Sequence, residues 1–398
     1  MLCAAAVLAA CSHPEARGAR SWNRRAAAAY LDRRADWWVE WPGAARDHGT
    51  VCVSCHTTLP YALARARLGG PPDSGASLVQ RRVLDNVRAR VRLWKDVEPY
   101  YANRSGDGSK AAESRGTEAV LNALILADAD ASTGVLGDDA RAAFGHMWAL
   151  QETSGGASGA WPWLRFALEP WEGKDSRYYG AALAALAVGE APDGYRSSPS
   201  IQHHLQLLRE YLDREYGTQP LLNRLMLLWA STRLRGLITP DRRSAIVDEL
   251  LAEQRSDGGW SVFALAASTH SIGARLRSII SSESDGYATG LAVLALLDVD
   301  ARRQRPAVRR AVEWLVRKQN TDGYWPASSM NARRDPSSDA GKFMSDAATA
   351  YAVLALTTAD SRQVAHSAAA QKAGIAVEHL HVQRASGEQP RVAEERQR

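Results

Sequence analysis

The stretch "RAVEWLVRKQNTDGYW", residues 310–325, joins an amphipathic pattern to a tight turn that ends in tryptophan. Its charged residues fall on one helical face and Ala, Val, Leu and Trp on the other, which predicts a helix with one solvated side. Glycine then supplies a backbone conformation that other residues resist. A second copy, "VDELLAEQRSDGGW" at 247–260, has the same Gln-x3-Gly-x-Trp spacing. A third version with an insertion is "MWALQETSGGASGAWPW" at 147–163.

A longer pattern repeats around these turns. Ala/Leu-rich runs that are apolar on nearly every helical face begin near residues 54, 114, 176, 221, 284 and 345. Successive runs begin about 60 residues after one another, except for one shorter step. Each run follows an amphipathic stretch; these lie at 25–38, 78–94, 138–151, 200–216, 241–254 and 306–319. Outer helices with one wet side therefore alternate with buried inner helices. The sequence predicts an all-α fold, a single (α/α)6 toroid over residues 24–375 whose inner helices line a central cavity.

The Gln-to-Trp turns resemble the QW repeats of triterpene cyclases such as squalene-hopene cyclase, in the superfamily of terpenoid cyclases and prenyltransferases. The resemblance covers roughly residues 24–375 and implies a squalene-cyclase-like toroid that binds an apolar ligand such as an isoprenoid. It also implies alkene protonation by the middle Asp of a D-x-D-D-T-A motif. In the two nearest stretches that position holds Ala347 and Tyr287, so the known acid is absent. The zinc ligands of the related prenyl transfer cannot be assembled either.

Acidic residues stand at the predicted starts of inner helices, and we consider them weak catalytic candidates: Glu113, Asp175, Asp285 and Asp346. Their first interpretation is as helix N-caps, where the positive end of the helix lowers a carboxyl pKa and disfavours a neutral proton donor. A set of aromatic residues could line a hydrocarbon pocket, although ordinary core packing explains them equally well: Trp163, Trp171, Tyr178, Tyr179, Tyr287 and Tyr351.

The first repeat contains "VCVSCHTTLPYA", residues 51–62, with the pattern Cys-x-x-Cys-His. In c-type haem attachment, thiols such as Cys52 and Cys55 bond to the haem vinyl groups and a histidine such as His56 ligates iron. Ser54-Cys55-His56 occupies the register of Ser345-Asp346-Ala347 in the sixth repeat. The motif is therefore expected at the toroid mouth, at the start of the first inner helix. The alternatives are a Cys52–Cys55 disulfide, or a zinc or iron site that uses His48 or His56.

A closed ring would bring the sixth repeat beside the first. Met344 is therefore the first choice for the second axial ligand of a haem, followed by Met330 and His270. Without such a ligand the iron would be five-coordinate and open to small molecules.

The N-terminus indicates export. Residues 1–11 end in Leu-Ala-Ala-Cys, which resembles a lipoprotein signal peptide with Cys11 as the acylated residue. Residues 12–23 would form a tether and 376–398 a polar, disordered tail. We expect a periplasmic lipoprotein anchored to a membrane, with Ser12 favouring the outer one, and no later run is long enough to span a bilayer.

Three functions are consistent with these patterns. The first is an exported haem protein that moves electrons to a periplasmic redox partner or oxidises an apolar ligand. The others are an isoprenoid cyclase or isomerase without haem, and a non-catalytic ring that binds a hydrophobic ligand. The net charge of +5 is spread thinly without a basic stripe, so nucleic acid is not an expected partner.

Overall fold

The computed structural model of the chain describes residues 21–69, 75–101, 109–267, 283–299 and 304–363. Within these ranges the regular elements are helices, accompanied only by isolated β-bridges, so the predicted all-α class is confirmed. The predicted signal peptide with Cys11, the tail at 376–398 and the candidate ligand His270 lie outside the described residues. None of the described helices combines the length and apolarity that crossing a membrane would need.

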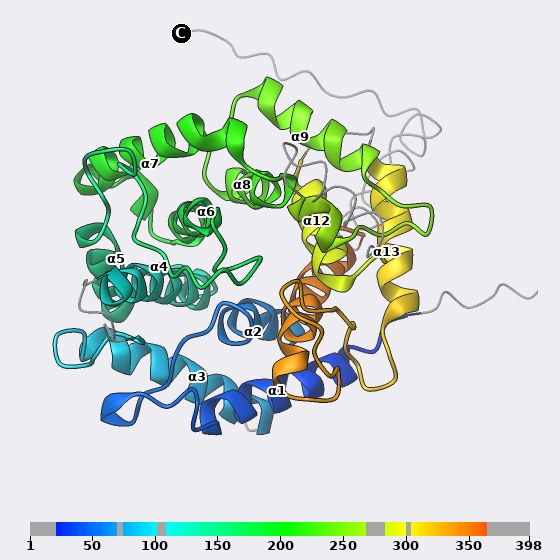
Figure 1. The fold of residues 1–398 in the computed structure, drawn as a ribbon, viewed down its shortest axis with the longest axis horizontal. Coiled ribbons are helices and arrows are strands. Elements are labelled where there is room, and N and C mark those ends of the chain that lie inside the picture. Colours follow the sequence, from blue (N-terminus) through cyan, green and yellow to red (C-terminus); the bar gives the residue numbers. More distant parts are fainter. Residues whose placement is uncertain (1–20, 70–74, 102–108, 268–282, 300–303, 364–398) are drawn as a thin grey trace, which may run out of the picture.

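The helices form two concentric layers (Figure 1). The outer layer contains α1 (Arg24–Glu40), α3 (Gly75–Arg92), α5 (Asp138–Ala149), α7 (Gln202–Glu215), α9 (Pro240–Ala252) and α13 (Arg305–Lys318). The inner layer contains α2 (Thr58–Arg65), α4 (Ser109–Ala131), α6 (Ser176–Glu190), α8 (Leu221–Arg233), α12 (Gly286–Asp298) and residues 343–363, called here the sixth inner helix. The predicted alternation of outer and inner helices is confirmed.

Shorter helices join these layers. They are η1 (Asp47–Gly49), η2 (Ala66–Leu68), η3 (Tyr195–Ser197), η4 (Pro199–Ile201), η5 (Tyr216–Thr218), α10 (Val262–Ala266) and η7 (Ala340–Lys342).

Residue type explains which helix lies in which layer. In α6 every residue from 178 to 188 is buried, and most are alanine or leucine. In α13 only one face is buried, through Ala307, Ala311, Trp314 and Leu315, and arginines occupy the other. Small residues allow the inner helices to approach closely: a side chain at Gly290 would meet the backbone of Tyr351 on the sixth inner helix at 2.6 Å. An amphipathic helix therefore stays outside and an apolar one moves inside.

The Gln-to-Trp turn at 319–325 closes the ring. The Gln319 side chain donates to the carbonyl oxygens of Gly323 and Asn23, both at 3.0 Å, and accepts from the backbone N–H of Asn23 at 2.6 Å. The Trp325 indole donates to the Leu315 carbonyl at 2.8 Å, which fixes the turn to its own helix. Because Asn23 caps α1, this turn joins the last outer helix to the first.

The other two turns have the same construction. In each, the glutamine amide donates to the turn glycine and to the start of the next outer helix, and the indole donates to the preceding helix. The partners are Gly258 and Ala307 for Gln254, Gly159 and His204 for Gln151, Leu250 for Trp260, and Met147 for Trp161. The motif is thus a staple between consecutive outer helices.

Alanine in place of Gly323 is expected to destabilise the ring. Gly323 has a φ of 92°, and an added Cβ would lie 2.2 Å from a backbone carbon of Ala26 in α1. The strained conformation alone costs about 1–3 kcal/mol, and the clash adds to it. Gly134 is the matched control, since its φ is 74° but no atom lies within 4 Å of an added Cβ. Urea unfolding followed by circular dichroism should show a clearly larger loss for G323A than for G134A; equal losses would contradict this role.

Three helix starts differ from the prediction. The helix α2 begins at Thr58, because the Ser54 hydroxyl accepts from the backbone N–H groups of Thr57 and Thr58, and Cys-x-x-Cys-His therefore precedes the helix. The helix α4 begins earlier, at Ser109, since the residues before Glu113 are small or good helix formers. The sixth inner helix begins at residue 343, so Asp346 lies in its first turn.

Candidate functional site

The Cys-x-x-Cys-His segment lies at the mouth formed by the N-terminal ends of the inner helices. The Trp38 indole of α1 donates to the Cys52 carbonyl at 2.7 Å, and the Cys52 N–H donates to the Ala44 carbonyl at 2.9 Å. These bonds fix Cys52 at the start of an irregular stretch, which leads through a turn at residues 55–57 into α2. Cys52 and Cys55 are buried, and their sulfurs are not joined to each other.

The two thiols are protonated at neutral pH in this environment. Burial raises the pKa of Cys52 to about 12 and raises the pKa of Cys55 well above its ordinary value. Thiolate nucleophiles and metal ligands need the opposite shift. Among the described residues, no group of three or more His, Cys, Asp or Glu side chains is placed to hold a metal ion, and His48 is exposed and bonded to Asp47.

His56 lies among three aromatic rings. Phe343 stacks on it at a centroid distance of 3.9 Å, Trp38 meets it edge-on at 4.9 Å, and Trp171 lies at 5.9 Å. This enclosure lowers the pKa of His56 to about 3, because burial disfavours the charged imidazolium. The imidazole is therefore neutral at physiological pH.

A hydrogen-bond chain sets the tautomer of His56. The Thr57 hydroxyl donates to Asp346 at 2.9 Å, so it must accept from Nδ1–H of His56, which lies 2.9 Å away. The proton therefore resides on Nδ1, and Nε2 carries the lone pair. Burial raises the pKa of Asp346, but the Arg34 guanidinium and the Tyr30 hydroxyl, both donating at 2.8 Å, stabilise its carboxylate.

These contacts confirm that the sixth repeat lies beside the first. They also correct the interpretation of Asp346, which is 2% exposed and joins its own helix to α1 and to the segment before α2. Its partners lie on α1 and just before α2, so the carboxylate is a clamp across the closing seam of the ring. A group with three donors is poorly suited to release or accept protons during catalysis.

Asp285 is an N-cap, as expected, but its pKa shifts in the unexpected direction. Its carboxylate accepts from the backbone N–H groups of Ala288 at 2.8 Å and Val262 at 2.6 Å. Burial nevertheless raises the Asp285 pKa to about 6, because loss of solvation outweighs those donors. The donors at the helix end lower this pKa as expected, but burial is the larger effect and the net shift is upward.

The remaining acidic candidates are dispersed. Glu113 lies inside α4, paired with Lys110 at 2.6 Å and accepting from the Arg165 N–H at 3.2 Å. Asp175 precedes α6 without capping it, and burial raises its pKa. It lines a cavity of about 180 Å³ together with Met330. The structure therefore does not bring these carboxylates together at one centre.

The structure positions Met344 next to the residue that contacts His56. Met344 is 4% exposed in the core, whereas the ring stacked on His56 belongs to Phe343. Met330 lies in the other cavity, with Asp175. Axial ligation by Met344 remains a prediction.

Buried phenols lie on the ring axis behind Cys55. Trp171 meets Tyr287 edge-on at 5.9 Å, and Tyr287 meets Tyr351 edge-on at 5.0 Å. The hydroxyls of Tyr179, Tyr287 and Tyr351 and the indole N–H of Trp171 form no hydrogen bond of normal geometry among the described residues, although Tyr179 faces Tyr351 and Tyr287 faces Trp171. Cys55 is close enough to raise the pKa of each of the three tyrosines. Buried polar atoms normally have partners, so this cluster suits an occupant with hydrogen-bonding atoms.

The other two predicted aromatic residues have different roles. The Tyr178 hydroxyl donates to the Leu212 carbonyl of α7 at 3.0 Å, and Tyr178 therefore fixes the outer layer. The Trp163 indole donates to the Trp171 carbonyl at 2.9 Å and supports the mouth.

The loop at 164–175 partly covers the mouth. It carries Trp171 onto His56 and Tyr287, and a bridge pairs Leu168 with Glu172. Asn331 joins this loop to the segment after α13, because its side chain accepts from the Glu169 N–H and donates to the Glu169 carbonyl, both at 2.7 Å. The two loops thus form a lid over the Cys-x-x-Cys-His segment.

Glu172 is a lid residue that the sequence analysis missed. Burial raises its pKa to about 7, with a smaller opposing effect from Lys110. The folded state therefore favours the protonated form of Glu172. Because the unfolded chain ionises Glu172 at a lower pH, the folded state loses stability as pH rises from the unfolded-state pKa to about 7. Glu172→Gln should be more stable than the wild type at pH 8 and nearly equal at pH 4, as measured by thermal unfolding. A difference independent of pH would contradict the raised pKa; E152Q is a control whose carboxylate is also partly buried.

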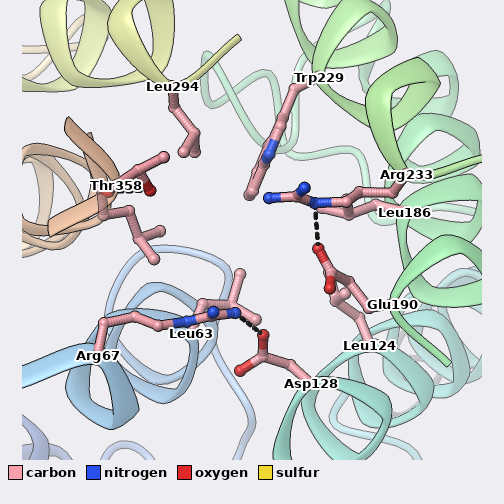
Figure 2. A pocket seen from close by; sticks show the side chains of 11 residues that line it. Leu63, Arg67, Leu124, Asp128, Leu186, Glu190, Trp229, Arg233, Leu294 and Thr358 are labelled. Carbon is pink, nitrogen blue, oxygen red and sulfur yellow. Dashed lines mark hydrogen bonds and ion pairs between the residues drawn. The ribbon is translucent and has the colours of Figure 1, made fainter. Parts of the chain in front are cut away.

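Deeper along the axis the ring is packed (Figure 2). Each inner helix contributes one large apolar side chain: Leu63, Leu124, Leu186, Trp229, Leu294 and Leu354. Two ion pairs, Arg67–Asp128 and Arg233–Glu190, both at 2.8 Å, lie at the far end. The remaining space of about 30 Å³ holds one or two waters, far below the roughly 300 Å³ of a small ligand pocket. The predicted cavity is therefore filled at this depth.

Several residues that shape the site were not selected from the sequence: Thr57, Phe343, Trp38, Tyr30 and Arg34. Thr57 and Phe343 had only a weak signal, their proximity to His56 and Met344. Arg34 had a clearer one, because it falls on the apolar face of the 25–38 stretch, where an unpaired charge would be costly.

Together, the two concentric layers, the Gln-to-Trp staples and the closed seam define an α/α toroid. Residues 285–390 match the family model of the squalene-hopene cyclase C-terminal domain. No curated protein matches this sequence.

Several solved glycosidase structures are similar to this chain. A glycosidase variant in complex with glucose is 14% identical, with a TM-score of 0.49, and covers 84% of this chain and 96% of its own. A wild-type glycosidase is 13% identical, with a TM-score of 0.47, and covers 84% and 97%. At this level of similarity the matches say nothing about what this chain binds.

Proposed function

We propose that this chain is an exported c-type haem protein built on an α/α toroid, with electron transfer as its activity. Cys52 and Cys55 would hold the group through thioether bonds, and Nε2 of His56 would ligate the iron. Bound haem would supply one-electron redox chemistry at the mouth of the ring.

The hydrogen-bond chain from His56 through Thr57 to Asp346 carries this proposal. A histidine ligand must be neutral with a free lone pair, and its other nitrogen is usually fixed by a hydrogen bond. The low pKa of His56 meets the first condition, and Thr57 meets the second. A buried structural histidine needs neither a free Nε2 nor a carboxylate relay.

The surroundings also fit the group. Aromatic rings enclose His56, and apolar enclosure is one of the means by which proteins tune a redox centre. The hydroxyls of Tyr179, Tyr287 and Tyr351, which lie near Cys55, would donate hydrogen bonds to polar atoms of the bound group. Because both sulfurs are buried, their attachment must precede folding, and Trp171 with its lid must move to admit the macrocycle.

Export and lipid anchoring form part of the same proposal. Residues 1–11 supply the signal and Cys11 the anchor, and bacterial haem attachment takes place outside the cytoplasm. A periplasmic redox partner would then approach the lid side of the ring. If the site also binds an apolar ligand, the protein would oxidise that ligand instead of only passing electrons on.

One observation favours a second candidate, an isoprenoid cyclase or isomerase without haem. Glu172 has a pKa near 7 and lies close enough to Cys52 and Cys55 to affect both thiols, and a general acid works best when its pKa lies near the operating pH. If this candidate is right, the purified protein should be colourless and carry a bound apolar molecule. A ring that only binds a ligand would give the same result.

Haem staining after denaturing electrophoresis tests the proposal. The full chain should be exported from a host competent in cytochrome maturation, and it should give a stained band and a haem absorption spectrum. Folded, exported protein that neither stains nor absorbs would overturn the proposal. Mass spectrometry of extracted lipids from such colourless protein would then test the second candidate.

A further inference from the structure

A basic groove of about 530 Å³ lies between η3, α7 and the C-terminal end of α8. Four arginines from separate positions line it: Arg196 in η3, Arg209 in α7, Arg233 at the end of α8, and Arg235 just after it. The hydroxyl residues Ser197 and Thr232 and the apolar Leu234 complete the lining. Among the residues that the structure describes, no carboxylate lines this groove.

The charges in the groove are largely uncompensated. Arg233 pairs with Glu190, but Arg196, Arg209 and Arg235 form no side-chain hydrogen bond or ion pair within the described part of the chain. Arg209 is also partly buried, where an unpaired charge is unfavourable. Like charges that converge without a counterion repel one another, so an anion would relieve the repulsion.

The ends of helices do not account for these arginines. The C-terminal end of α8 points toward the groove, and basic residues can stabilise such an end by donating to its carbonyls. None of Arg196, Arg209 and Arg235 makes such a bond in the described structure. Their guanidinium groups therefore remain available to a ligand.

We propose that this groove binds the phosphate group of an anionic ligand. Guanidinium groups recognise phosphate oxygens with paired, charge-assisted hydrogen bonds, and the exposed Ser197 hydroxyl adds a neutral donor. The volume exceeds that of a single phosphate, which suits a phosphomonoester, a diphosphate or a lipid headgroup. The site lies away from Cys55 and does not depend on the proposed haem.

Calorimetric titration with pyrophosphate tests the soluble source. The wild type should bind it, and the double variant Arg209→Gln/Arg235→Gln should bind at least about tenfold more weakly, since two charged partners are lost. The matched control is Arg25→Gln/Arg33→Gln, which removes the same charge from exposed arginines of α1 and should bind as the wild type does.

Co-sedimentation with vesicles tests the lipid source. Phosphatidylglycerol vesicles should retain the chain, made without residues 1–20, more than phosphatidylcholine vesicles do, and the groove variant should lose that difference if the phosphate belongs to a lipid. Groove-dependent binding in either arm supports the proposal and identifies the source. Absence of binding in both arms, or equal weakening by the control variant, would overturn it.

Discussion

Alanine at Asp346 is expected to destabilise the folded chain by about 3 kcal/mol, because removing one partner of a buried ion pair leaves the other charge uncompensated. Arg34 is 5% exposed and would keep only Asp339 as its acidic partner, while the hydroxyls of Tyr30 and Thr57 would lose their acceptor. The seam between the sixth inner helix and α1 would therefore open first. Urea unfolding at pH 7 measures the loss.

Asp360 provides the matched control for that experiment. It joins the same two helices by pairing with Arg24 at 3.4 Å, but both side chains are more than 40% exposed. Exposed pairs contribute at most about 1 kcal/mol. If D346A loses no more stability than D360A, the buried clamp does not hold the seam.

Serine at both Cys52 and Cys55 is expected to abolish covalently bound haem. A hydroxyl cannot replace the thiol in the thioether bond, so the denatured variant should not stain. The loss should be complete, because no other cysteine lies near this segment in the sequence. Haem staining of exported protein, normalised to the amount of chain, gives the measurement.

Two comparisons make that result specific. Cys11→Ser should lose the lipid anchor and still stain, which separates attachment from anchoring. Circular dichroism of the double variant should show a folded helical chain, since serine is close to cysteine in size and only two core positions change. A double variant that stains as strongly as the wild type would exclude these sulfurs as the attachment points.

The repeat made the architecture predictable from the sequence. Each repeat of about 60 residues contains one apolar and one amphipathic stretch. This local pattern assigns the apolar helix to the inner layer and the amphipathic helix to the outer layer. The QW turns could also be predicted from the sequence, because Gln254 and Gln319 each precede their own glycine and tryptophan by the same number of residues. The cap at Asp285 was local as well, and the sequence identified it.

The carboxylate environments were not predictable in this way. The direction of the Asp285 pKa depends on how deeply it is buried, which is set by elements around the mouth and not by its own helix. The same holds for Glu172, whose raised pKa comes from a lid formed by an irregular loop. Desolvation is a property of the assembled structure, so a residue's place in a motif does not reveal it.

The sequence alone determined that this chain alternates outer and inner helices in a ring, and that a Cys-x-x-Cys-His segment belongs to the first repeat. The structure added that the segment precedes the helix α2. Only the tertiary structure decided what that segment touches. Tyr30 and Arg34 are 316 and 312 residues away from Asp346 along the chain, and the fixed tautomer of His56 depends on that junction. Ring closure brings together side chains that no local pattern relates, and the same closure fills the axis with one large residue from each inner helix.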